Sequence, residues 1–171
     1  MQQINTLYSN GYYITLQEIP DEISLTFVIY GCDVHCPDCH SKHLWNTSDR
    51  ESLDLFPVTK KKINELLERY KQISCVLFMG GEWKPDVLLD LIKHCTKHNK
   101  KVALYSGRGL EYFFKEGTNP LCHYLTYLKV GPYNKNRGGL DNPKTNQELF
   151  YVYNAGICLE NITYKLQRGA T

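Results

Sequence analysis

The sequence predicts an α/β domain with a mainly parallel sheet. Between residues 59 and 130, short apolar runs alternate with segments in which apolar residues recur at helical spacing, the pattern of repeated strand–helix units. A glycine closely follows three of the apolar runs, at Gly80, Gly107 and Gly131. Ligands of parallel sheets bind at the carboxyl ends of the strands, so these glycines mark the expected functional edge.

The first part of the chain has the signals of a hairpin followed by a helix. Residues 12–18 and 23–30 are rich in β-branched and aromatic residues, and the turn sequence Pro20-Asp21-Glu22 separates them. Thr59 is a typical N-cap, and the apolar residues after it are spaced i, i+3, i+4 and i+7. A helix is therefore expected from Thr59 to about Lys71.

The middle of the chain alternates between strands and helices. Cys75–Met79 is a continuous apolar run, which is typical of a strand buried on both faces. A helix is expected from Pro85, because proline is favoured at the first helical position. Lys101–Tyr105 and Tyr124–Val130 are the next expected strands, with a short helix at 110–115 between them. Residues 131–149 then form a long glycine- and proline-containing loop, which a compact domain usually keeps for a function.

Length, composition and charge exclude several classes of protein. The 171 residues suit one domain, and 42% hydrophobic content with 22% charge excludes a disordered or fibrous chain. The net charge of +2 gives no strong attraction to nucleic acid. No apolar run approaches the roughly 20 residues of a membrane span. Residues 1–13 are polar and resemble no signal peptide, so we expect a cytoplasmic chain with reduced thiols and neither nucleic-acid nor membrane partners.

Three of the seven cysteines fall within eight residues. Cys32, Cys36 and Cys39 have helical spacing, but Pro37 would break a helix there, so a loop that directs three thiols to a metal is expected. Soft thiolates suit both zinc and iron–sulfur clusters. Zinc would need a fourth ligand from a nearby histidine, namely His35, His40 or His43. The spacing leaves both metals open.

The cysteine motif and a later glycine-rich turn together resemble the radical S-adenosylmethionine superfamily. The turn is Gly80-Gly81-Glu82, directly after an expected strand. The resemblance implies one radical SAM domain over residues 1–171, built as a partial (β/α) barrel that is open on one side. It also implies a 4Fe–4S cluster on Cys32, Cys36 and Cys39, with S-adenosylmethionine on the fourth iron. The two glycines allow close approach, and the carboxylate of Glu82 complements the ammonium group of that cofactor.

Further segments are similar to the activating proteins of anaerobic ribonucleoside-triphosphate reductases. They are residues 31–40, Leu44-Trp45-Asn46, Tyr105-Ser106-Gly107, Val130-Gly131-Pro132-Tyr133 and Thr145-Asn146-Gln147. The resemblance makes 31–47 the cluster loop and gives 131–149 a functional role. It adds four candidates for the cofactor site, namely Ser106, Gly107, Asp38 and Asn146. The sequence departs from the family pattern at Asp38, Trp83 and Val130.

The resemblance implies a glycyl-radical activating enzyme. In that family the reduced cluster passes one electron to the sulfonium of S-adenosylmethionine, and the resulting radical takes a hydrogen atom from a glycine of the reductase. Expected partners are the anaerobic reductase and a low-potential electron donor such as flavodoxin. Two alternatives stay open: a radical enzyme that acts on a small molecule or peptide, and a zinc-stabilised binding module. The other four cysteines are expected in the core: Cys75, Cys95, Cys122 and Cys158.

Overall fold

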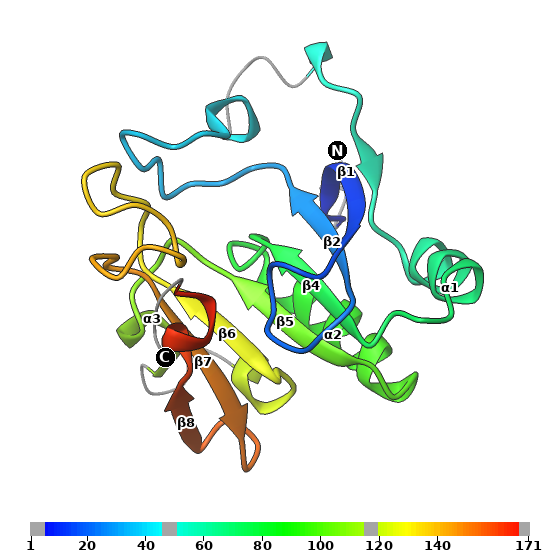
Figure 1. Cartoon of the computed structure of the whole chain (residues 1–171). Coiled ribbons are helices and arrows are strands. Elements are labelled where there is room, and N and C mark those ends of the chain that lie inside the picture. The colour runs from blue at the N-terminus through cyan, green and yellow to red at the C-terminus, as the bar shows by residue number, and fades with distance from the viewer. Residues whose placement is uncertain (1–5, 46–50, 115–119, 168–171) are drawn as a thin grey trace.

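A computed structural model describes residues 6–45, 51–114 and 120–167. Eight strands form one sheet in the order β3-β1-β2-β4-β5-β6-β7-β8 (Figure 1). The strands are β1 (Tyr8–Thr15), β2 (Ser24–Ile29), β3 (Phe56–Pro57), β4 (Cys75–Met79), β5 (Lys101–Tyr105), β6 (Tyr127–Val130), β7 (Glu148–Tyr153) and β8 (Cys158–Asn161). The helices are α1 (Lys60–Arg69), α2 (Pro85–Lys97) and α3 (Glu111–Phe114), with 3₁₀ turns η1 (Lys42–Leu44), η3 (Pro120–His123) and η4 (Thr163–Leu166).

The centre of the sheet is parallel. Strands β2, β4, β5 and β6 are neighbours, with Phe27 opposite Phe78 and Phe78 opposite Leu104. Antiparallel strands flank this centre, β1 and β3 on one side and β7 and β8 on the other. The prediction of an open α/β sheet with a mainly parallel centre is confirmed, and so is the hairpin of β1 and β2.

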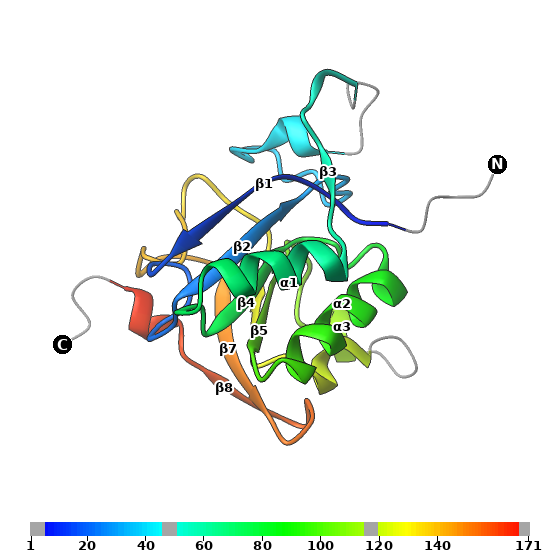
Figure 2. The same ribbon diagram turned by 90° about the vertical axis from the view of Figure 1, so that its right-hand side faces the viewer.

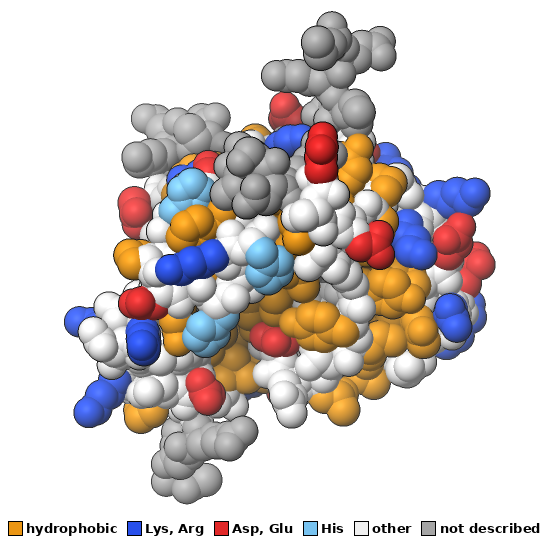
Figure 3. Space-filling view, turned by 90° about the horizontal axis from the view of Figure 1, so that it is seen from above, with side chains coloured by type: hydrophobic (Ala, Val, Ile, Leu, Met, Phe, Trp, Pro, Cys, Tyr) orange, Lys and Arg blue, Asp and Glu red, His pale blue; other side chains and the backbone are white. Residues whose placement is uncertain are grey.

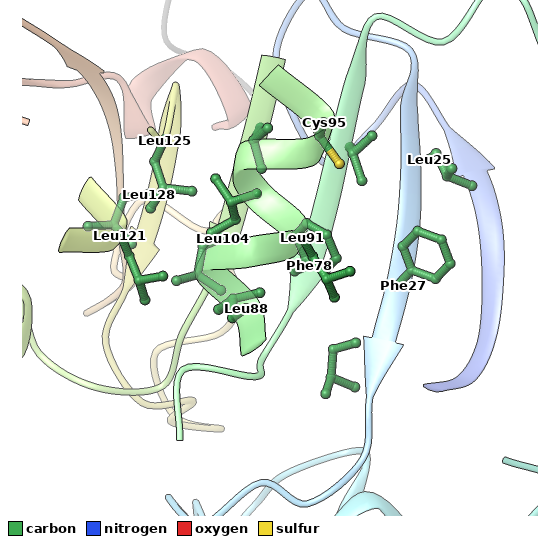
Figure 4. Close-up of a cluster of buried hydrophobic side chains, with 14 of the residues drawn as sticks. Leu25, Phe27, Phe78, Leu88, Leu91, Cys95, Leu104, Leu121, Leu125 and Leu128 are labelled. Carbon is green, nitrogen blue, oxygen red and sulfur yellow. The ribbon is translucent and has the colours of Figure 1, made fainter. Parts of the chain in front are cut away.

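The helices α1 and α2 cover one face of the sheet (Figure 2). The side chain of Thr59 accepts a hydrogen bond from the backbone N–H of Lys62 at 3.1 Å, and Pro85 occupies the first turn of α2, so both expected helix starts are confirmed. The main core lies between these helices and the sheet (Figure 4). Its aromatic centre is Phe27 stacked on Phe78, with ring centroids 5.9 Å apart.

A second, smaller core lies on the opposite face of the sheet. It contains Leu77, Ala103 and Leu149 from the strands, packed against Ile19 and Ile162 from the connecting segments. These residues alternate along their strands with residues of the main core, as expected for strands that are buried on both faces. The sheet is therefore anchored on both sides, and the loops at the carboxyl ends of β4, β5 and β6 are left for a site.

Some boundaries differ from the prediction. The strand expected at Tyr124 begins only at Tyr127, because the chain is still turning out of η3. Strand β7 begins at Glu148, so the long loop spans 131–147. Cys75, Cys95 and Cys122 are buried as predicted, but Cys158 is half-buried on the edge strand β8, so its core assignment was wrong. Residues 46–47 of the expected cluster loop and Lys115 of the expected short helix lie outside the described residues.

None of the helices that the structure describes could span a bilayer, since α2, with 13 residues, falls short of the roughly 20 required.

Candidate functional site

The carboxyl ends of β4, β5 and β6 meet in a set of backbone hydrogen bonds. The N–H of Gly80 donates to the carbonyl of Tyr105 at 2.9 Å, and the N–H of Ser106 donates to that of Lys129 at 2.9 Å. Gly80 and Gly131 have φ angles of +95° and +98°, a region that favours glycine. Two of the three glycines that the sequence singled out, Gly80 and Gly131, therefore turn the chain away from the sheet at one shared edge.

Glu82 lies at this edge and is buried, with 1% of its surface exposed. Its Oε1 accepts a hydrogen bond from the hydroxyl of Ser106 at 2.5 Å, whereas Oε2 has no partner within the described part of the chain. Burial raises the pKa of Glu82, although the Ser106 hydrogen bond and the charge of Arg108 oppose that shift. A buried, half-satisfied carboxylate is costly. It suits a cation that binds here, such as an ammonium group.

The side chain of Trp83 packs against two glycines of the site. A Cβ atom on Gly80 would lie 2.6 Å from the Trp83 ring, and one on Gly31 would lie 3.2 Å from it. The indole thus packs over two glycines, one at the end of β4 and one directly before the first cluster cysteine. At this position the tryptophan joins the two motifs by packing.

The cluster loop is irregular, as Pro37 predicted. His35 has a φ of +51°, which turns the chain between Cys32 and Cys36, and the N–H of Cys39 donates to the carbonyl of Cys36 at 3.0 Å. Burial raises the pKa of Cys32, while hydrogen bonds from the backbone N–H groups of residues 34 and 35 oppose that shift. Histidine side chains gather on the face of the molecule that carries this loop (Figure 3).

The three cluster cysteines are not gathered into a preformed metal site. Among the described cysteine, histidine, aspartate and glutamate side chains, no group of three is placed to hold a metal ion. The donor set nevertheless fits an iron–sulfur cluster, because three thiols on one short loop supply the soft ligands that such clusters take. Cys36 and Cys39 also lie near enough to Lys129 to act on it electrostatically, so a positive charge lies near these two cysteines.

Lys129 is a site residue that the sequence reasoning missed. Its side chain is 8% exposed, and Nζ donates to the carbonyl of Gly131 at 3.0 Å. Burial lowers the pKa of Lys129 to about 8, and the nearby Cys36 and Glu82 act in the opposite direction. The sequence does contain a signal for it, because Lys129 lies inside the apolar run that precedes Gly131. A lysine in a buried strand usually has a partner or a functional role.

A cavity of about 1300 Å³ opens on the face of the sheet opposite the helices. Its lining includes Glu18, Cys39, His40, Tyr105, Lys129 and Gln147. Of the three cluster cysteines, only Cys39 reaches the lining, and Glu82 remains beneath the surface. The structure therefore places Cys39, His40 and Ser41 of the cluster loop in the lining of a large cavity, to which the glycine–glycine–glutamate turn does not contribute.

The remaining candidates are distributed around this edge. A Cβ on Gly107 would lie 3.1 Å from Cγ1 of Val34, so the backbone of Gly107 is in close contact with a side chain of the cluster loop. Asn146 donates from Nδ2 to the carbonyl of Pro132 at 2.8 Å, and its buried Oδ1 lacks a partner among the described residues. Asp38 is exposed and does not line the cavity. The structure thus brings Gly107 and Asn146 to the site region and leaves Asp38 at its surface.

Comparison with known proteins agrees with this arrangement. A family model described as a 4Fe-4S single cluster domain matches residues 23–149. The crystal structure of QueE from Escherichia coli is similar in fold, with a TM-score of 0.55 and 19% sequence identity over 81% of this chain and 68% of that chain. A search of curated proteins gave no match.

The family match supports an iron–sulfur cluster rather than the zinc alternative. The likeness to QueE, at 19% identity, shows a shared open α/β fold. The matched residues span the hairpin strand β2, the cluster loop and the long loop before β7. This chain belongs to the family of 4Fe–4S single cluster domains.

Proposed function

We propose that this chain is a radical SAM enzyme that generates a glycyl radical on an anaerobic ribonucleotide reductase. The observation that carries the finer part is the convergence of the two segments most specific to the activase resemblance. Gln147 donates from Nε2 to the carbonyl of Gly131 at 3.3 Å, and Asn146 donates to that of Pro132. Tyr133 in turn packs against His40 of the cluster loop, with ring centroids 4.7 Å apart.

The chain's own residues would bind and orient the cofactors. Cys32, Cys36 and Cys39 would hold a 4Fe–4S cluster, and the unpartnered Oε2 of Glu82 would accept the ammonium group of S-adenosylmethionine. Ser106 fixes the carboxylate through its hydroxyl, which leaves Oε2 for that contact. When bound, the cluster and S-adenosylmethionine supply the one-electron reductive cleavage that ends in removal of a hydrogen atom from a glycine Cα.

The size of the cavity supports a macromolecular substrate. Sites for one small ligand usually measure about 300–1000 Å³, whereas this cavity measures about 1300 Å³. The exposed Leu16 and Tyr164 belong to its lining, and exposed apolar side chains at a cavity suit contact with another protein. A glycine-bearing loop of the reductase could therefore enter beside the cofactor. A cytoplasmic location belongs to the same proposal, because low-potential chemistry suits a reducing compartment.

The test combines reconstitution with radical detection. The full chain is loaded anaerobically with iron and sulfide, reduced by flavodoxin or dithionite, and mixed with S-adenosylmethionine and an anaerobic reductase. We expect iron–sulfur absorbance, formation of methionine and 5′-deoxyadenosine, and a glycyl-radical signal in electron paramagnetic resonance. A protein that holds zinc with four ligands and never cleaves S-adenosylmethionine would refute the proposal.

A second candidate is a radical enzyme with a small-molecule or peptide substrate. The cavity supports it, because Lys129 and Glu18 place a cation and a carboxylate on one lining, and such a pair suits a zwitterionic ligand. Cleavage of S-adenosylmethionine without a glycyl-radical signal from any reductase tested would favour this candidate over the activase.

A further inference from the structure

Arg108 connects the end of β5 to the cluster loop. Its Nη2 donates to Oδ2 of Asp33 at 2.6 Å, and Asp33 directly follows the first cluster cysteine. Beside this ion pair, Gly107 is in close contact with Val34. The segment of the loop between Cys32 and Cys36 is therefore held against residues 107 and 108.

The same residue also reaches Glu82 by two routes. The backbone N–H of Arg108 donates to Oγ of Ser106 at 3.0 Å, and that hydroxyl donates to Glu82. The guanidinium group lies 4.5 Å from the ring centroid of Tyr112, whose hydroxyl donates to the backbone carbonyl of Glu82 at 3.4 Å. The carbonyl of Arg108 accepts a hydrogen bond from Gly131 at 2.8 Å. One residue thus links the cluster loop to the ends of all three strands.

We propose that Arg108 is a positioning residue that holds the cluster loop at a fixed position relative to Glu82. The inference rests on the proposed function, in which the cluster loop would hold the 4Fe–4S cluster and Glu82 would hold the ammonium group of S-adenosylmethionine beside it. A displacement of about 1 Å in such an assembly can lower a rate by roughly 100-fold. The side chains of Arg108 and Asp33 are 28% and 44% exposed, and partly exposed ion pairs add little to stability. We therefore expect the ion pair to act mainly by positioning the cluster loop and to add little to the stability of the fold.

The first experiment measures binding and cleavage in three full-length variants: Arg108→Met, Asp33→Asn and the double variant. After anaerobic reconstitution we expect wild-type iron content, about tenfold weaker binding of S-adenosylmethionine, and cleavage slowed by roughly 10- to 100-fold. The double variant should be no worse than Arg108→Met, because both changes remove the same contact. The matched control is Lys60→Met, which removes an ion pair of the same 2.6 Å length to Asp90 and should alter none of these quantities.

The second experiment uses the apoprotein and does not depend on activity. Amide hydrogen exchange should be faster over residues 32–45 in Arg108→Met and unchanged in β4, since only the loop loses its attachment. Arg108→Lys keeps the charge and should recover part of the protection. In the loaded protein, the change that S-adenosylmethionine causes in the cluster's paramagnetic resonance spectrum should be weakened in Arg108→Met.

The outcomes separate the two proposals. Unchanged affinity and unchanged exchange in Arg108→Met would overturn the positioning role. Loss of iron in either single variant would also overturn it, because the residue would then be needed to bind the cluster rather than to position the loop relative to Glu82. A wild-type protein that binds no S-adenosylmethionine would instead refute the proposed function.

Discussion

The substitution Glu82→Gln should weaken cofactor binding and stabilise the apoprotein at the same time. It keeps the shape of a buried side chain whose Oε1 is bonded to Ser106 and whose Oε2 has no partner among the described residues, but it removes the negative charge. The two effects have opposite signs because the carboxylate is unfavourable without the cofactor and favourable with it. Few structural residues would show this combination.

The binding effect follows from the lost charged contact. A hydrogen bond to a charged group contributes about 1.5–3 kcal/mol, which corresponds to a dissociation constant for S-adenosylmethionine raised by roughly 10- to 100-fold. The amide can still accept from Ser106, so the turn itself should keep its conformation.

The stability effect depends on pH, and its sign follows from the raised pKa of Glu82. Between the unfolded pKa near 4.5 and the higher folded value, the native state binds more protons than the unfolded state. The free energy of unfolding therefore falls as pH rises through this interval. Glu82→Gln lacks that loss, so its advantage over the wild type should be absent below pH 4.5. At neutral pH the advantage should reach about 1–2 kcal/mol.

Anaerobic equilibrium binding measures the first effect, and urea unfolding of the apoprotein between pH 4 and 7 measures the second. Glu65→Gln on the exposed side of α1 is the control, and it should change neither quantity. An unchanged dissociation constant in Glu82→Gln would show that the carboxylate does not meet the ammonium group. A less stable apoprotein at pH 7 would show that Glu82 is a structural residue.

Three further predictions concern the ligands, the strand ends and acid stability. Alanine at any one of the three cluster cysteines should abolish S-adenosylmethionine cleavage and lower the bound iron measured by colorimetry, whereas Cys158→Ala should change neither. Gly131→Ala should lower the free energy of unfolding by about 1–3 kcal/mol, measured in urea, because φ is +98° and the new Cβ would lie 2.9 Å from a backbone carbonyl; an unchanged value would show that the turn relaxes. Burial alone would raise the pKa of Glu22, but hydrogen bonds from Lys101 and Tyr127 lower it overall, so its contribution to stability is lost as pH falls below about 4.5. Glu22→Gln should therefore lose less stability than the wild type between pH 5 and 3 in urea titrations, and identical profiles would contradict this assignment.

The elements that the sequence predicted best have local signals. The apolar run Cys75–Met79 matches β4, and Thr59 and Pro85 mark the starts of α1 and α2. The antiparallel strands β7 and β8 were not predicted, because their place at the sheet edge depends on pairing with β6 rather than on their own pattern. Strand β6 was shorter than expected for a similar reason, since it begins where pairing with β5 begins.

The candidate site also contains some residues that local motifs predict and others that only the fold brings together. The cysteines and the glycine–glycine–glutamate turn are short motifs that can be read from adjacent residues. Arg108 and Asp33 are 75 positions apart, and only the fold brings them together. Lys129 was overlooked because the apolar run does not indicate on which face of the strand its lysine lies. In the structure it lies on the cavity face, the same face of β6 as Tyr127.

The separation of the two cores from the cluster loop has a consequence for maturation. Neither buried cluster of side chains includes Cys32, Cys36 or Cys39, so the packing of both cores does not depend on the cluster ligands. Cys36 is buried and Cys32 and Cys39 are half-buried, so insertion of a cluster into the folded apoprotein would require the loop to open while both cores stay packed. If the proposed cluster were destroyed by oxygen, the packed cores would leave a folded apoprotein that could be loaded again.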